Sequence, residues 1–205
     1  MDIASMPPEE RARIERVLAA TTARGFHSTF VPDRAAALTK VLDLLPRGAK
    51  VAHGSSTTLQ EIGLIDLLKR PDSGCTYQNA LWTAENDGAK RARLRARLSL
   101  EADVYMGSVQ AVCETGEAVA ADQSGSRQAF YVFGPPRVVW VAGINKIVPD
   151  VAAGMRRVRE VALPKEDARM KAAGAAGSSI GKLVIYEKER PGRTSLVLVG
   201  EPLGF

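Results

Sequence analysis

The sequence predicts an α/β fold in which helices cover both faces of a mainly parallel sheet. Helical and strand patterns alternate through the first part of the chain, at residues 8–22, 26–31, 33–45 and 50–52. This alternation is typical of parallel strands joined by helices. The second observation is the almost continuously apolar run RVVWVA at residues 137–142. A run of this kind is expected of a central strand that is buried on both faces.

Each element of the N-terminal part has its own signal. Pro8 is favoured in a first helical turn, and the apolar spacing that follows predicts a helix to about Thr22. Asp33 is a good N-cap for a helix that continues through Leu45. The short strand after it leads through hydroxyl residues into a helix that is expected to end at Leu68.

The remaining elements are expected in the following order. They are a loop or short edge strand at Pro71–Ala80, a basic helix at Ala84–Leu100, a strand at Ala102–Met106, and short strands at Glu117–Ala121 and Gln128–Phe133. After the central strand come a loop at 143–149, helices at Asp150–Ala162 and Pro164–Ala173, a flexible small-residue loop at Ala172–Gly181, and a terminal hairpin of Lys182–Tyr186 and Ser195–Val199.

No repeat or linker interrupts this pattern, so we expect a single domain over residues 1–205. It would comprise N-terminal helices and a strand (1–45), a motif-bearing core (46–169), and a flexible loop with the hairpin (170–205). The 205 residues are enough to bury one core of ordinary size.

The composition narrows the class of protein. The net charge is +5, but basic and acidic residues are interspersed and no nucleic-acid-binding motif accompanies them, so we expect no nucleic-acid partner. No apolar run is long enough to cross a bilayer, and the first residues lack the apolar region of a signal peptide. These features predict a cytoplasmic protein without a membrane contact. Cys75, Cys113, His27 and His53 form no metal-binding motif, so neither a metal nor another cofactor is expected.

The segment KVAHGSSTTLQEI, from Lys50 to Ile62, is the most informative stretch for function. It reads as a strand, a Gly-Ser-Ser turn and a helix that begins with hydroxyl residues. Backbone N–H groups at such a helix start point into one concavity, and the helix dipole favours an anion there. The segment therefore predicts an anion site, although the same hydroxyls could serve only to cap a structural helix.

Four loops are rich in groups that bind or react: His53–Thr58, Cys113–Gly116, Asp122–Arg127 and Gly143–Lys146. Loops after alternate parallel strands gather at the carboxyl edge of an open sheet, so we expect the first, second and fourth loops to share a site. The place of the third depends on the direction of its hairpin, which the sequence leaves open.

If these loops converge, Glu114 is the carboxylate placed to act as a base or nucleophile, and Lys146 and Arg127 supply positive charge. Glu114 and Lys146 are the candidate catalytic residues. The candidate ligand-binding residues are Gly54, Ser55, Ser56, Thr57, Thr115, Gly116, Ser126, Arg127, Asn145 and Lys146. Each could instead be structural: Asn145 could bond the loop backbone, Lys146 could cap a carbonyl, and Glu114 could be a solvated turn residue.

The run from ADVYMGSVQAVCETG through SGSR, the GP before the apolar strand and GINKIVPD resembles the LUD domain, the lactate-utilization C protein family. The upstream VAHGSSTTLQEIGL resembles the first glycine-serine motif of that family. The resemblance spans about Pro46 to Arg169 and the closing EPLGF. The chain departs from it in having no cysteine between Ala172 and Lys182, where many relatives carry several.

The resemblance implies a fold like that of ribose-5-phosphate isomerase and the CoA transferases, which is a three-layer α/β sandwich with small antiparallel β additions. It also implies an accessory component of an iron–sulfur L-lactate oxidation system, with iron–sulfur partner subunits and a small anionic metabolite as ligand. The alternative is a stand-alone enzyme on a phosphorylated sugar, a CoA ester or another small anion. Proteins of this class commonly self-associate, so a homo-oligomer is also expected.

Overall fold

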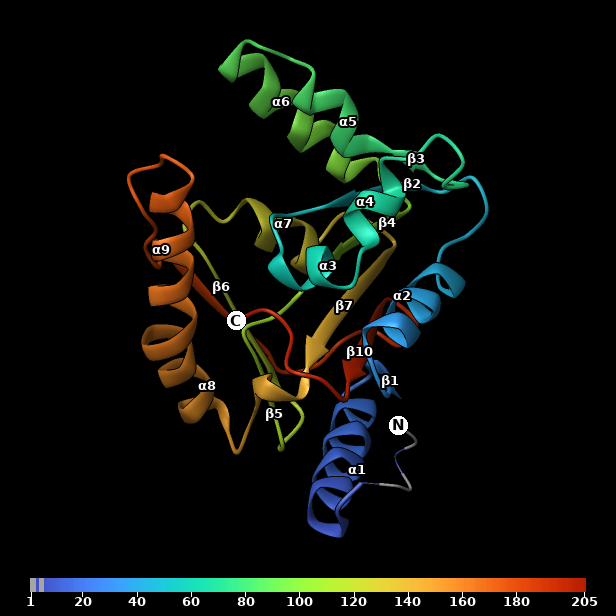
Figure 1. Ribbon diagram of the computed structural model, residues 1–205, viewed down its shortest axis with the longest axis vertical. Helices are drawn as coiled ribbons and strands as arrows, with labels where there is room; N and C mark the ends of the chain where they lie inside the picture. Colours follow the sequence, from blue (N-terminus) through green and yellow to red (C-terminus); the bar gives the residue numbers. More distant parts are fainter. Residues whose placement is uncertain (1–2, 4–5) are drawn as a thin grey trace.

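A six-stranded parallel sheet forms the centre of the computed structural model (Figure 1). Its strands lie in the order β1-β10-β7-β4-β2-β3, and every neighbouring pair is parallel. The strands are β1 (His27–Val31), β2 (Lys50–His53), β3 (Thr76–Tyr77), β4 (Val104–Gly107), β7 (Arg137–Gly143) and β10 (Thr194–Val199). The structure describes Ile3 and residues 6–205, so residues 1, 2, 4 and 5 of the expected domain lie outside it.

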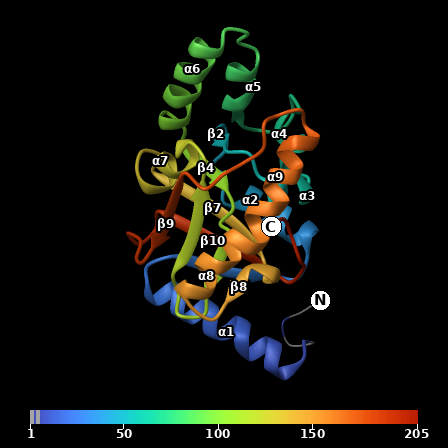
Figure 2. The same cartoon turned by 90° about the vertical axis from the view of Figure 1, so that its left-hand side faces the viewer.

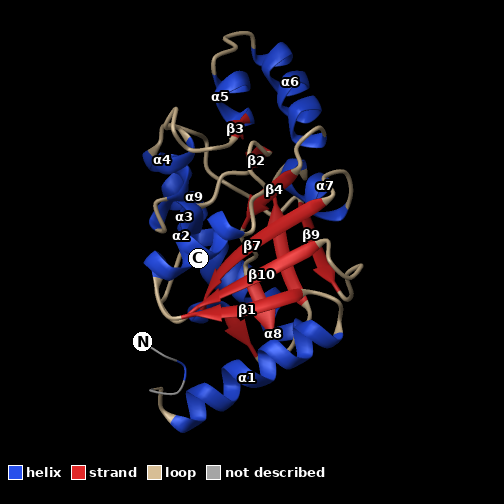
Figure 3. Ribbon diagram, turned by 90° about the vertical axis from the view of Figure 1, so that its right-hand side faces the viewer, coloured by secondary structure: helices blue, strands red, loops and turns tan. Residues whose placement is uncertain are grey.

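Helices α2 (Arg34–Asp43), α3 (Thr57–Glu61) and α4 (Leu64–Leu68) cover one face of this sheet. Helices α1 (Pro8–Ala23) and α7 (Ser126–Val132) cover the other face together with a second sheet (Figure 3). Side chains of one strand alternate between the two cores: Val139 and Val141 join the first, whereas Trp140 joins the second. All residues of β7 except Arg137 are buried, which confirms the central strand predicted from RVVWVA.

The second sheet has four strands in the order β8-β5-β6-β9 and is mixed. The strands are β5 (Ala111–Cys113), β6 (Ala118–Asp122), β8 (Ile147–Val148) and β9 (Lys182–Tyr186). The expected terminal hairpin is wrong, because β9 pairs with β6 in this sheet while β10 lies between β1 and β7 in the other. Five of the six residues of β10 are buried, as a central parallel strand requires and an exposed hairpin does not.

The strand expected at Gln128–Phe133 is also wrong, because this segment forms helix α7. The carboxylate of Asp122 accepts hydrogen bonds from the backbone N–H groups of Ser124 and Gly125, at 3.0 and 2.8 Å, and Gly125 turns the chain with a φ of 86°. The helix then buries Phe130 and Tyr131 against the sheet. Tertiary packing therefore overrides the β propensity of this aromatic segment.

Several element boundaries differ from those predicted. Gly63, with a φ of 77°, divides the helix expected through Leu68 into α3 and α4. An additional short helix, α5 (Gln78–Thr83), precedes the basic helix α6 (Gly88–Leu100). No described helix is both long and apolar enough to cross a membrane.

The two helices expected after residue 149 form one continuous rod. It consists of α8 (Val151–Arg157), a π-helical turn η3 (Val158–Ala162) and α9 (Leu163–Ala172). Pro164 lies in the first turn of α9, where its missing N–H removes one helical hydrogen bond next to the π turn. Figure 2 shows this rod in front of the sheets. Val158 of the rod packs with Ala111 and Val119 of the second sheet.

Candidate functional site

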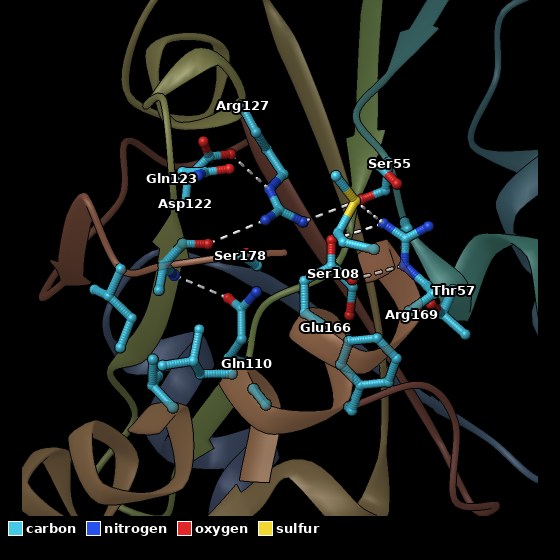
Figure 4. A pocket seen from close by; sticks show the side chains of 18 of the residues that line it. Ser55, Thr57, Ser108, Gln110, Asp122, Gln123, Arg127, Glu166, Arg169 and Ser178 are labelled. Carbon is cyan, nitrogen blue, oxygen red and sulfur yellow. Dashed lines mark hydrogen bonds and ion pairs between the residues drawn. The ribbon is translucent and has the colours of Figure 1, made fainter. Parts of the chain in front are cut away.

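A pocket of about 250 Å³ lies at the carboxyl edge of the central sheet, and residues of η3 and α9 form part of its wall. Figure 4 shows side chains that line it. Three neighbouring strands, β2, β4 and β7, send the residues that follow them into its wall: Ser55–Thr58, Ser108–Gln110 and Lys146. This is the edge at which open parallel sheets bind ligands. The π-helical turn η3 also lines the pocket, and such turns are frequent at functional sites.

Gly54 makes room for Arg127 in the wall of the pocket. A β-carbon at position 54 would lie 3.1 Å from Cδ of Arg127 and 3.3 Å from the hydroxyl oxygen of Tyr105. The guanidinium of Arg127 donates to the backbone carbonyls of Ser55 and Ala121, at 3.2 and 3.0 Å. Its Nε lies 3.4 Å from the Asp122 carboxylate, and the two side chains form an ion pair. Arg127 thus ties the glycine-serine turn to β6.

Lys146 lies at the floor of the pocket and is only 1% exposed. Its ammonium donates to the hydroxyls of Thr58 and Ser108, at 2.9 and 2.8 Å, and no carboxylate of the described residues forms an ion pair with it. Burial lowers the pKa of Lys146 from 10.5 to about 7, with further contributions from the positive charges of Arg157 and Arg127. A substantial fraction of this lysine is therefore neutral at neutral pH.

The pocket has more positive than negative side chains. Four basic residues line it, Arg95, Arg127, Lys146 and Arg169, against two acidic ones, Asp122 and Glu166. Glu166 forms two hydrogen bonds of 2.7 Å to Arg169, and Asp122 pairs with Arg127. Arg95 contacts the hydroxyl of Ser126 at 3.2 Å and has no carboxylate partner among the described residues. The arrangement favours an anion.

Part of the pocket lining is apolar. Val158, Ala162, Leu163 and Met170 of the rod contribute to it, together with Ile180 of the 173–181 loop. The hydroxyls of residues 55–58 also line the pocket. The loop at 173–181 thus forms part of the pocket wall, and its Ser178 N–H is held by the carboxylate of Asp167 at 2.9 Å. A ligand with a charged head and an apolar portion matches these two surfaces.

The loop Cys113–Gly116 does not reach the pocket, so the expectation that it shares a site with the loops His53–Thr58 and Gly143–Lys146 is wrong. Glu114 pairs with Arg13 and Arg16 of α1, at 2.7 and 3.1 Å, and these arginines hold its pKa below the usual value. Thr115 bonds to Glu117, and a β-carbon on Gly116 would lie 2.6 Å from the carbonyl oxygen of Ala20. This loop packs against α1 because the chain after β5 turns directly into β6.

Asn145 holds the C-terminal tail and does not line the pocket. Its side-chain oxygen accepts the N–H of Leu203 at 3.0 Å, and its amide donates to the carbonyl of Gly204 at 3.2 Å. The role of Asn145 is therefore structural, but its partners are backbone groups of the tail and not of its own loop. The tail that it holds continues to Phe205, which lines the pocket. Asn145 therefore acts on the pocket only through the position of the tail.

Of the predicted ligand-binding residues, the structure brings six to the pocket: Ser55, Ser56, Thr57, Ser126, Arg127 and Lys146. Gly54 lies behind the wall, and Thr115, Gly116 and Asn145 lie elsewhere. Ser108 and Arg95 were missed. Ser108 directly follows a strand, which is a usable signal, whereas Arg95 is one of several arginines on α6 and nothing in its sequence context distinguishes it. The described residues hold no cluster of three or more metal-ligating side chains.

Comparison with known proteins agrees with this architecture. The family model of the LUD domain matches residues 14–199. The chain belongs to the LUD domain family. It is therefore a lactate-utilization-type protein in the general sense of that family.

A crystal structure of a DUF162 family protein from Deinococcus radiodurans is similar to this LUD domain. The TM-score is 0.55 at 12% sequence identity, and the alignment covers 95% of this chain and 100% of the other. This likeness shows a shared fold. The comparison with curated proteins finds no match for the chain.

Proposed function

We propose that this LUD domain binds a small anionic metabolite, a carboxylate or a phosphate, in the pocket at the carboxyl edge of its central sheet. The observation that carries the proposal is the charge of the pocket: Arg95 and Lys146 have no carboxylate partner among the described residues. Buried or half-buried cations without an anion favour binding of one from solution. The hydroxyls of Ser55 and Thr57 are available to accept and donate hydrogen bonds to the same ligand.

The biological role that we propose is that of an accessory component of an iron–sulfur L-lactate oxidation system in the cytoplasm. The resemblance to lactate-utilization C proteins supports this role, and lactate and pyruvate are small carboxylates of the charge that the pocket favours. Cys75 and Cys113 are free thiols, as is usual in the cytoplasm. Isolation of the protein from lactate-grown cells should recover an iron–sulfur protein with it. Recovery of this chain alone, with normal growth on lactate after deletion, would argue against the role.

Thermal unfolding in the presence of single anions tests the binding proposal. The panel contains lactate, pyruvate, sugar phosphates, nucleotides and CoA esters. A ligand at about one hundred times its Kd adds ~2.7 kcal/mol to the free energy of unfolding, which in a domain of this size raises Tm by roughly 5–10 °C. No shift with any of these anions would contradict the proposal.

A matched pair of variants connects such a shift to the pocket. Arg95→Gln removes a pocket cation that donates a hydrogen bond of 3.2 Å to the hydroxyl of Ser126. Because hydrogen bonds to charged groups contribute about 1.5–3 kcal/mol, we expect Kd to rise roughly tenfold or more. Arg93→Gln removes the same charge from an exposed position of the same helix and should leave Kd nearly unchanged. Equal effects of the two substitutions would assign the shift to net charge instead of the pocket.

A further inference from the structure

Ser108 and Lys146 meet because the strands before them are neighbours. β4 and β7 are paired in parallel, with Gly107 opposite Trp140, and both chains leave the sheet at the same edge. The hydroxyl of Tyr131 donates to the carbonyl of Ser108 at 3.1 Å and fixes the backbone there. The side-chain oxygen of Ser108 lies 2.8 Å from Nζ of Lys146, within direct proton-transfer distance. Both residues line the pocket.

The surroundings of Lys146 also suit a general base. Thr58 accepts a second hydrogen bond from the amine, at 2.9 Å, and helps to fix its position. The charged groups that act on it are Arg157 and Arg127, which disfavour the ammonium, and Glu61, which favours it less strongly. The pKa of about 7 provides the neutral amine that a proton acceptor needs.

We propose that Ser108 is a nucleophile and Lys146 its general base, forming a Ser–Lys pair that transfers an acyl group from an ester or thioester. Nothing in the anion-binding role requires a serine hydroxyl against a buried amine. A serine activated by lysine is a recurrent arrangement for acyl transfer on unrelated folds. The preference for an anionic substrate rests on the proposed function of the pocket, whereas the reactivity of the pair does not.

The neutral amine of Lys146 takes the hydroxyl proton of Ser108 while Oγ forms a bond to the acyl carbon, and the carbonyl π pair moves to oxygen. The tetrahedral intermediate collapses by breaking the bond to the leaving oxygen or sulfur, which takes the electron pair and receives the proton from the Lys146 ammonium. Water then attacks the acyl-serine in the same way and releases the acid. In the free protein, the Ser108 hydroxyl donates to the carbonyl of Val141 at 2.6 Å, so the proposed step requires the hydroxyl hydrogen to turn from this carbonyl toward Lys146.

Acylation by p-nitrophenyl acetate tests the pair. This ester is uncharged, so its reaction does not depend on the anion site, and failure here is distinct from failure of the anion screen. The wild-type protein should release p-nitrophenolate in a burst equal to the protein concentration and gain one acetyl group. Peptide mapping by mass spectrometry should place the group on Ser108. The rate should rise with pH through the pKa of Lys146, about 7.

Three variants complete the test. Ser108→Ala should abolish the label, and Lys146→Met should slow acylation of Ser108 at least about 100-fold, the usual contribution of a general base. Lys165→Met removes an exposed lysine of α9 and should leave the rate unchanged. Circular dichroism and thermal unfolding check that each variant is folded, and the peptide map of the wild-type protein needs no variant. An acetyl group on Lys146 itself, no label on Ser108, or an unchanged rate in folded Lys146→Met would each overturn the proposal.

Discussion

Removal of Lys146 should change how the stability of the protein depends on pH. Burial lowers the pKa of this lysine from 10.5 to about 7 in the folded chain. Between these two values the unfolded chain holds a proton that the folded chain has released. The free energy of unfolding therefore rises with pH through this window and falls as the pH drops toward 7.

The size of this effect follows from the two pKa values. One pKa unit corresponds to about 1.4 kcal/mol, and the lysine of the folded chain is only half deprotonated at pH 7. Between pH 7 and pH 9 the lysine should contribute about 2 kcal/mol of additional stability. Lys146→Met keeps an unbranched side chain of similar length without the titrating amine, so it should lack this contribution.

Urea denaturation at the two pH values measures the contribution. At each pH, the free energy of unfolding of Lys146→Met is subtracted from that of the wild type. The value at pH 7 is then subtracted from the value at pH 9, so that the contributions of other titrating groups cancel. Lys165→Met, in which an exposed lysine is replaced, should show no such double difference. A double difference near zero for Lys146→Met would contradict the prediction, because the lysine would then have the same pKa in the folded and unfolded chain.

Three further substitutions have expected outcomes. Gly107→Ala places a methyl group 1.8 Å from the hydroxyl oxygen of Tyr131, so urea denaturation should show a loss of about 1–3 kcal/mol. Glu114→Gln breaks ion pairs with two partly exposed arginines, so it should lower the free energy of unfolding by no more than about 1 kcal/mol. Calorimetry should show unchanged affinity for the anion. A loss of affinity would show that Glu114 contributes to anion binding. Asn145→Ala removes two hydrogen bonds to the tail and should lower the free energy of unfolding by about 1–3 kcal/mol. Hydrogen exchange at the backbone N–H of Leu203 should become faster. Unchanged protection of this N–H would show that other contacts hold the tail.

Local patterns predict much of the central sheet and its helices. The cap at Asp33 is present, with its carboxylate accepting the N–H of Ala36, and the apolar run at 137–142 is a buried central strand. The predictions that were wrong concern segments whose secondary structure or strand pairing depends on contacts with residues distant in sequence. Residues 126–132 have strand-like aromatic content but form a helix, and β10 joins strands distant in sequence. No local signal distinguishes these outcomes from a hairpin.

The site is predictable in part for the same reason. The turn at 54–58 and Lys146 follow neighbouring parallel strands, so topology alone brings them to one edge. Glu114 follows a strand of the second sheet, and its loop faces α1 instead. The side of the pocket formed by the rod α8–α9 depends on how a helix distant in sequence packs, which no motif encodes.

A crystal structure with the anion that gives the largest thermal shift would show directly whether this pocket is the anion site. We expect the anion in the pocket at the carboxyl edge of the sheet, within hydrogen-bonding distance of Arg95 or Lys146 and of a hydroxyl from residues 55–58. An anion bound elsewhere, for example beside the arginines of α1 at Glu114, with this pocket holding only water, would contradict this expectation.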